Sequence, residues 1–263
     1  MAPKGGHIML HIRRETIKEM IAHDGSVNVQ NLVKRFDVSV ETIRRDLEAL
    51  EKEGFLKRVY GGAVLTRPTV TEPAYFWRKE HNQREKEAIG EIAAGLIEDG
   101  DTVFLSYGTT TLEVARHMKH KKNVTVITNS VFIVMELANC RDITTYCLGG
   151  RVREGDMSTS GALAEQNMRF FNVNKVIAGV GGITPELGLM DTQMDESGLL
   201  QAYINTVGCI IAVCDHSKLG NVATYNICPA NKLTHLVTDS GSPRGDLDAY
   251  RAMGISVHVA QLD

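Results

Sequence analysis

The chain has few cysteines, almost no tryptophan and no long apolar run. Its 263 residues include five cysteines and one tryptophan. The cysteines are odd in number and none forms a Cys-x-x-Cys pair, which argues against a disulfide framework and a zinc site. No apolar run reaches the roughly 18–20 residues that cross a bilayer, and residues 1–10 lack the apolar core of a signal peptide. We therefore expect a cytoplasmic protein with reduced cysteines and no membrane partner.

The composition is otherwise that of a folded protein of one or two domains. Hydrophobic residues make up 43% of the chain and charged residues 23%, which excludes extensive disorder. The net charge of −3 gives no sign of a nucleic-acid partner. The charge is uneven, however, because residues 1–65 carry a net +2 (11 Lys and Arg against 9 Asp and Glu) and the remainder a net −5. This charge asymmetry indicates a function only if the secondary structure places the basic residues on one surface.

The first 65 residues follow the order of a winged helix-turn-helix. Apolar residues at helical spacing predict helices over residues 14–23 and 29–36. Ser39 is a good N-cap for a third helix that runs to about Glu53 and is closed by Gly54. Residues 55–64 are typical of a β-hairpin with Gly61 and Gly62 near its turn. Helix, helix, tight turn, helix and hairpin is the arrangement with which many proteins enter a DNA groove.

The third helix and the hairpin carry candidate DNA-binding residues. The apolar stripe Ile43, Leu47 and Leu50 must face a small core, so the opposite face is left for base edges in a major groove. Basic residues on the hairpin would reach phosphate or the minor groove and add salt-dependent affinity. The candidates are Ser39, Glu41, Thr42, Arg44 and Arg45 at the helix, and Lys57, Arg58, Tyr60 and Gly61 on the hairpin.

A plainer interpretation of the two arginines stays open. Arg44 and Arg45 could form only i,i+4 ion pairs, with Glu48 and Glu41 respectively, on a solvated helix face.

This region resembles the DNA-binding signature of the DeoR family of bacterial transcriptional regulators. The resemblance rests on Phe36-Asp-Val-Ser-Val-Glu-Thr-Ile-Arg-Arg-Asp-Leu-Glu-Ala-Leu50 and on Arg58-Val-Tyr-Gly-Gly-Ala63. It implies a DNA-binding domain over residues 9–65 and a double-stranded operator as partner. Residues 66–84, with two prolines and a charged stretch, are expected to be an interdomain linker.

Residues 85–263 predict an α/β domain with a mainly parallel sheet. Helical patterns over 85–97, 112–119 and 130–139 alternate with β-rich runs over 102–106, 124–128 and 143–148. Further β-rich runs follow at 175–178, 209–214, 235–238 and 256–260. Strands that alternate with helices form parallel sheets covered on both faces, and ligands bind at the carboxyl ends of such strands.

Five polar loops follow these expected strands. The loop at 106–111 combines a glycine turn, three threonine hydroxyls and the free amides of a helix N-terminus, which suits a phosphate. The candidate effector-binding residues are Ser106, Tyr107, Gly108, Thr109, Thr110, Thr111, Asn129, Ser130, Gly149, Gly150, Arg151, Gly181, Asp215 and Lys218. Each loop taken alone could be an ordinary turn, and the threonines could form a plain N-cap.

The second half is also similar to the DeoR family, in its C-terminal effector domain. The motifs Tyr-Gly-Thr-Thr-Thr, Thr-Asn-Ser, Leu-Gly-Gly and Asp-His-Ser-Lys carry the likeness, and Tyr107 departs from the family's Ser-Gly-Thr pattern. The resemblance implies a Rossmann-like, ribose-5-phosphate-isomerase-like domain that senses a phosphorylated sugar or related metabolite. It further implies a nucleoid-associated homodimer or homotetramer that represses a carbohydrate-utilisation operon.

Two alternatives remain for the larger domain, namely a catalytic isomerase and an assembly module. An isomerase needs a carboxylate base beside its substrate. The residues that correspond to the isomerases' acidic cluster, Gly179–Thr184, have no ionisable side chain. Asp191, Asp195 and Glu196 follow in an expected loop, where they would contact sugar hydroxyls or a neighbouring subunit. We expect binding without turnover, no cofactor and, from the spacing of the histidines, no metal.

Overall fold

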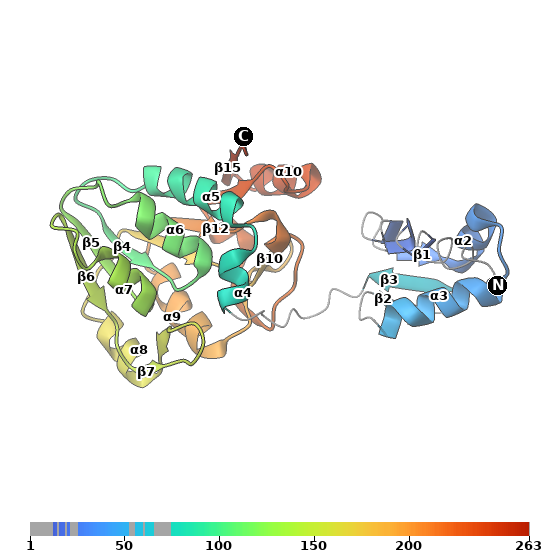
Figure 1. Cartoon of the computed structure of the whole chain (residues 1–263), viewed down its shortest axis with the longest axis horizontal. Coiled ribbons are helices and arrows are strands. Elements are labelled where there is room, and N and C mark those ends of the chain that lie inside the picture. The colour runs from blue at the N-terminus through green and yellow to red at the C-terminus, as the bar shows by residue number, and fades with distance from the viewer. Residues whose placement is uncertain are drawn as a thin grey trace, which may run out of the picture. The chain divides into compact units, whose positions relative to one another are not determined.

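The computed structural model of the chain describes residues 13–14, 16–18, 20–21, 26–52, 56–59, 61–65 and 75–262 (Figure 1). It divides into two compact units, Met1–Pro68 and Thr69–Asp263. Within the described ranges, no helix is long and apolar enough to cross a bilayer. Figure 1 labels the elements as they are named below.

The first unit is a winged helix-turn-helix, as the sequence predicts. Residues 13–14, 16–18 and 20–21 are helical, which leaves the rest of the expected first helix, to residue 23, outside the described residues. The remaining elements are β1 (Ser26–Asn28), α2 (Val29–Phe36), α3 (Val40–Lys52), β2 (Leu56–Val59) and β3 (Gly62–Leu65). Strand β3 lies between β1 and β2 and is antiparallel to both. The strand β1 was not expected from the sequence. It widens the predicted hairpin into a three-stranded sheet.

The small core of this unit is closed by an apolar stripe and a buried ion pair. Ile43, Leu47 and Leu50 of α3 are fully buried against the other helices and the sheet, as expected. Asp46 lies between them on the same helix and is also buried. Its carboxylate accepts hydrogen bonds from Nε of Arg13 (2.6 Å) and of Arg14 (3.0 Å). These pairs fix the first helical segment against α3.

The second unit is built on a seven-stranded parallel sheet. The strands lie in the spatial order β15 (Ser256–Ala260), β14 (His235–Asp239), β12 (Cys209–Val213), β9 (Lys175–Gly179), β4 (Thr102–Leu105), β5 (Val124–Thr128) and β6 (Ile143–Cys147). The chain starts in the middle at β4, runs outward through β5 and β6, and then returns to β9 on the other side of β4. The direction of winding therefore reverses between β4 and β9, which is where open parallel sheets have their binding crevice.

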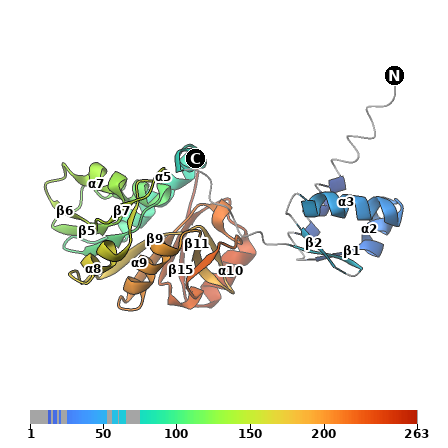
Figure 2. The same ribbon diagram turned by 90° about the horizontal axis from the view of Figure 1, so that it is seen from below.

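Helices cover both faces of this sheet because alternate strand residues point to opposite sides. Val103 and Leu105 pack with α5 (Gln83–Gly95), α6 (Thr109–His117) and α7 (Val131–Leu137). Phe104, between them in sequence, packs on the other face with α9 (Met194–Ile204). The helices α8 (Ala162–Met168) and α10 (Arg244–Ala252) also lie on this second face (Figure 2).

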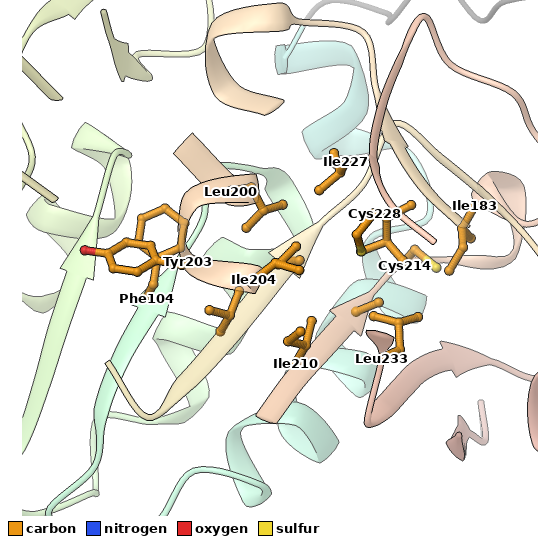
Figure 3. Close-up of a cluster of buried hydrophobic side chains, with 14 of the residues drawn as sticks. Phe104, Ile183, Leu200, Tyr203, Ile204, Ile210, Cys214, Ile227, Cys228 and Leu233 are labelled. Atoms are coloured by element: carbon orange, nitrogen blue, oxygen red, sulfur yellow. The ribbon is translucent and has the colours of Figure 1, made fainter. Parts of the chain in front are cut away.

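The core on the α9 side is large and continuous. Figure 3 shows Phe104 of β4 and Tyr203 of α9 in contact, with ring centroids 4.8 Å apart. The same cluster continues through Ile210 of β12 to Cys214 and Cys228. Both cysteines are buried and free, whereas Cys140 and Cys209 are partly buried and Cys147 is exposed, so the expectation that the cysteines are core residues holds for only part of the set.

Several elements of the second unit were not expected from the sequence. They include the short ribbon β7 (Arg151–Val152) and β8 (Thr159–Ser160), and a separate antiparallel sheet of β10 (Gly182–Thr184), β11 (Gly188–Asp191) and β13 (Tyr225–Cys228). The expected linker over 66–84 also needs correction. Residues 75–80 form the helix α4 (Tyr75–Glu80), and α5 begins at Gln83. The Tyr75 side chain is buried and stacks on Phe132, so α4 belongs to the second unit.

The helices α5 and α6 approach each other closely at one glycine. A Cβ atom built on Gly90 of α5 would lie 2.7 Å from the backbone carbon of Glu113 in α6, a separation that real Cβ atoms do not tolerate. Gly95 of the same helix has no heavy atom within 4 Å of such a Cβ. Gly90 therefore lies buried against a neighbouring helix, whereas Gly95, the exposed last residue of α5, has no such neighbour.

The substitution Gly90→Ala should lower the free energy of unfolding of the second unit by about 1–2 kcal/mol. Overpacking of this kind usually costs about 1–3 kcal/mol, which exceeds the roughly 0.5–1 kcal/mol that alanine gains over glycine inside a helix. Gly95→Ala, the matched control, should be neutral or slightly stabilising. Urea unfolding of the full chain, followed by circular dichroism, compares the two. Equal stabilisation by both substitutions would contradict the close contact.

Candidate functional sites

The second unit contains a cavity of about 230 Å³ at the carboxyl ends of β4, β9 and β12. This is the point where the winding of the sheet reverses. Seven of the predicted effector-binding residues line it: Tyr107, Gly108, Thr109, Thr110, Gly181, Asp215 and Lys218. The structure thus brings together the loops after three neighbouring strands, as parallel alignment requires.

The N-terminus of α6 forms one wall of the cavity. Gly108 precedes the helix with a φ of 147°, a conformation that favours glycine, and no side chain caps the helix there. The first N–H groups of an α-helix have no partner inside the helix, and they carry the positive end of its dipole. Those of Thr109 and Thr110 therefore present hydrogen-bond donors at the cavity, together with the Lys218 ammonium group.

A buried lysine holds the opposite wall. Lys86 of α5 is 5% exposed, and its ammonium group donates hydrogen bonds to the backbone carbonyls of Arg78 and His81, where α4 meets α5. Burial lowers the pKa of Lys86, while the nearby Asp215 carboxylate acts in the opposite direction. These bonds fix the end of α4 against the sheet.

Asp215 is an anion despite its burial. Burial alone would raise the pKa of this carboxyl group, but hydrogen bonds from Ser217 and Asn82 and the charge of Lys86 outweigh burial and hold the pKa below its usual range. Asn82 Nδ2 donates to Asp215 Oδ1 at 3.0 Å. The cavity therefore contains a fixed carboxylate, which can accept hydrogen bonds from hydroxyl groups.

Four predicted residues lie behind the cavity wall and shape it. Ser106 Oγ accepts a hydrogen bond from Gly179 N–H (2.9 Å), and Asn129 Oδ1 accepts one from Tyr107 N–H (3.0 Å). Thr111 donates to the Gly108 carbonyl at 3.1 Å, and Ser130 is the N-cap of α7. Each therefore joins a strand end or a helix end to its neighbour.

Three predicted residues do not lie at the cavity. Gly149, Gly150 and Arg151 follow β6, the edge strand of the sheet, two strands away from the reversal point. The Arg151 side chain is 75% exposed and pairs with Asp195 at 3.2 Å. It lines a separate hollow of about 190 Å³.

Sequence reasoning missed much of the cavity wall. The residues that line the cavity from α4, α5 and the corner between them are Trp77, Arg78, His81, Asn82 and Lys86. They fall in or next to the stretch that was interpreted as a linker, and the signal that could have revealed them is its unusual density of aromatic and charged side chains. Asp191 of β11 was assigned to a loop, but it is 4% exposed and lines the cavity.

The candidate DNA-binding residues form an exposed surface on the first unit. Ser39 Oγ accepts a hydrogen bond from Thr42 N–H (3.1 Å), so these two residues also cap α3. Arg45 is 76% exposed and lies 3.6 Å from Glu41, the weak pair that the plainer interpretation anticipated. Glu48, which the plainer interpretation paired with Arg44, forms an ion pair with Lys52 at 2.9 Å.

The wing residues divide into two kinds. Lys57 and Gly61 are exposed, and Tyr60 lies outside the described residues. Arg58 donates from its backbone N–H and its Nε to the Glu51 carboxylate of α3, at 2.8 and 2.7 Å. These two bonds lower the pKa of Glu51 and join the wing to α3.

Both units match models of one protein family. Residues 13–69 match the DeoR-like helix-turn-helix domain, and residues 81–240 match the DeoR C terminal sensor domain. The chain is 36% identical over 231 residues to the transcriptional repressor AccR of Agrobacterium fabrum, covering 88% of this chain and 90% of that protein. It is 32% identical over 248 residues to a putative aga operon transcriptional repressor of Escherichia coli, covering 93% and 92% respectively.

Among solved structures, the chain is similar to ribose 5-phosphate isomerase A of Methanocaldococcus jannaschii. The likeness covers 52% of this chain and 55% of that one, with 15% identity and a TM-score of 0.39. The sequence relatives and both domain models agree with the winged helix-turn-helix and the α/β unit described above. The chain belongs to the DeoR family of DNA-binding transcriptional regulators.

Proposed function

We propose that this regulator is a repressor whose DNA binding responds to a phosphorylated sugar or related metabolite in the cavity at the ends of β4, β9 and β12. The observation that carries the proposal is the convergence of the α6 N-terminus, Lys218 and the Asp215 carboxylate on one small cavity at the reversal point of the sheet. Two relatives, named as a transcriptional repressor and as a putative aga operon transcriptional repressor, support the assignment as a repressor.

The two ends of a sugar phosphate would find different partners here. The phosphate accepts hydrogen bonds from the N–H groups of Thr109 and Thr110 and pairs with Lys218, because helix N-termini and ammonium groups both favour anions. The hydroxyl groups donate to the Asp215 carboxylate. Apolar contact comes from Trp77, whose ring stacks on His81 with centroids 3.5 Å apart.

The cavity also offers a route by which a ligand acts on DNA binding. Its wall includes Trp77 and Arg78 of α4, the first described element after the DNA-binding unit in the sequence. A ligand that binds one arrangement of α4 more tightly than another shifts the population between them. We propose that this shift changes how the DNA-binding units of a homodimer or homotetramer meet their half-sites on the nucleoid.

An isomerase is the second candidate function because Asp191 places a buried carboxylate at the cavity. A carboxylate beside a sugar carbon is what proton abstraction requires. We favour binding without turnover, since Asp191 is already held by the Tyr107 hydroxyl group at 3.0 Å and the named relatives are repressors.

Binding of a sugar phosphate should change the fluorescence of Trp77, the sole tryptophan of the chain. Lys218→Ala should weaken that binding about 10- to 100-fold, the usual loss for one charge-assisted hydrogen bond. Lys232→Ala, which removes an exposed lysine outside the cavity, is the matched control. Fluorescence titration with ribose 5-phosphate, fructose 6-phosphate, glucose 6-phosphate and inorganic phosphate measures the effect. If none of the four compounds changes either the Trp77 fluorescence or the thermal unfolding midpoint, an effector of this class is excluded.

Arg45→Ala should weaken operator binding about 10- to 100-fold while leaving binding to unrelated DNA nearly unchanged, because a base-reading arginine supplies about 1–3 kcal/mol of discrimination. Lys57→Ala should weaken both kinds of binding by similar factors, as expected of a phosphate contact. Arg251→Ala, in the second unit, is the control. Fluorescence anisotropy with an operator selected from random duplexes by the wild-type protein separates these outcomes. Parallel losses for Arg45→Ala on all sequences would remove its role in base recognition.

Incubation of the protein with pentose and hexose phosphates should produce no isomer, as followed by NMR of the sugar. Asp191→Asn should leave that result unchanged. Isomerisation that this substitution abolishes would establish the catalytic alternative instead.

A further inference from the structure

Tyr107 is held rigidly at one end of the cavity. Its backbone N–H donates to Asn129 Oδ1 (3.0 Å), and its hydroxyl group donates to the Asp191 carboxylate, with oxygen distances of 3.0 and 3.1 Å. The guanidinium carbon of Arg153 lies 5.2 Å from the centroid of its ring. The side chain is 6% exposed. Asn129 therefore holds the backbone of Tyr107, while Asp191 and Arg153 contact its hydroxyl group and its ring.

The ring stands between two hollows. On one side Tyr107 and Asp191 line the cavity of about 230 Å³. Arg153, which lies over the Tyr107 ring, lines the second hollow of about 190 Å³ together with Thr192 and Glu196. The Tyr107 ring and its bond to Asp191 therefore lie where the lining of the first hollow meets Arg153, which lines the second.

Arg153 is held in place by partners other than Tyr107. Arg153 is ion-paired with Asp156 and lies 3.4 Å from the Glu196 carboxylate. Glu196 in turn accepts a hydrogen bond from the buried Ser158 at 2.7 Å. Because these partners hold Arg153 independently, removal of the ring should join the hollows rather than let Arg153 collapse into the space.

We infer that Tyr107 is a specificity-determining residue that limits the effector to a single phosphorylated sugar unit, with Asp191 as the residue that positions it. The inference rests on the proposed function, since it takes the effector to lie in this cavity with its phosphate at the α6 N-terminus. A cavity of about 230 Å³ is smaller than the roughly 300–1,000 Å³ of sites for larger ligands. A second sugar unit would have to displace a side chain that Asp191 and Arg153 both contact.

The test compares sugar phosphates that differ by one glucosyl unit. Glucose 6-phosphate is paired with trehalose 6-phosphate, and fructose 6-phosphate with sucrose phosphorylated on its fructose unit. Calorimetric titration gives the affinity ratio within each pair for the wild-type protein, Tyr107→Phe, Tyr107→Ala and Tyr107→Leu. Tyr107→Phe is the matched comparison for Asp191→Ala, because it keeps the ring and removes only the hydroxyl group that donates to Asp191. Tyr107→Leu serves if the alanine variant does not fold, and circular dichroism monitors folding of all variants.

The wild-type protein should prefer the single-unit phosphate of a pair about 10- to 100-fold, the usual loss when extra atoms meet a packed wall. Tyr107→Phe, which keeps the ring but loses its bond to Asp191, should relax the ratio to the same extent as Asp191→Ala. Tyr107→Ala and Tyr107→Leu should reduce this ratio to about threefold or less, because the extra unit then enters the second hollow. Asp191→Ala should also relax the ratio, whereas Asp191→Asn, whose amide oxygen still accepts the hydroxyl hydrogen, should preserve it. That rescue separates positioning from general destabilisation.

The results distinguish failure of the inference from failure of the proposed function. If the wild-type protein binds a single-unit phosphate and the ratio is unchanged in the folded alanine and leucine variants, Tyr107 does not set the size limit and the proposed function still stands. If no sugar phosphate binds the wild-type protein or any variant, the proposed function fails and the inference with it.

Discussion

The arrangement of the sensor unit depends on the burial of one ammonium group. Lys86 is almost inaccessible to water, and a charged group in such a place must be matched by hydrogen bonds and an opposite charge. The carbonyls at the end of α4 and the Asp215 carboxylate supply both. Because Lys86 binds these carbonyls and lies near Asp215, the α4–α5 corner lies against the end of β12. The cavity and its polar wall depend on that docking.

The strands of the sheet could be predicted well because each strand is marked by residues that are neighbours in the sequence. Strands β5 and β15 have the predicted bounds, since apolar runs between polar turns define them. The α6 N-terminus, Asp215 and Lys218 could also be placed at the cavity, because parallel strands bring their carboxyl ends to one edge. What could not be predicted depends on contacts between distant residues. Only the buried face of Tyr75 and the bonds of Lys86 reveal that α4 is part of the sensor unit, and only the sheet order reveals that Arg151 lies too far from the reversal point.

In each of the two units, a buried charged side chain binds the first helical segment to the rest of the unit. In the winged unit, Asp46 lies among the leucines and isoleucine of α3 and draws Arg13 and Arg14 onto that helix. In both units a buried ionic group joins the first helical segment to the body of the domain. Apolar contacts alone would be less selective about the angle at which such a segment docks, because hydrophobic burial is not directional.

The close contact at Gly90 has a mechanical consequence for signalling. At Gly90, where α5 has no side chain, its backbone lies against the backbone and Cβ of Glu113 in α6, so a shift of either helix at this point meets closely packed atoms. The donors on α6 and Lys86 on α5 consequently move as one body. Lys86 in turn binds the carbonyls of Arg78 and His81, so α6, α5 and the end of α4 are joined in one connected block.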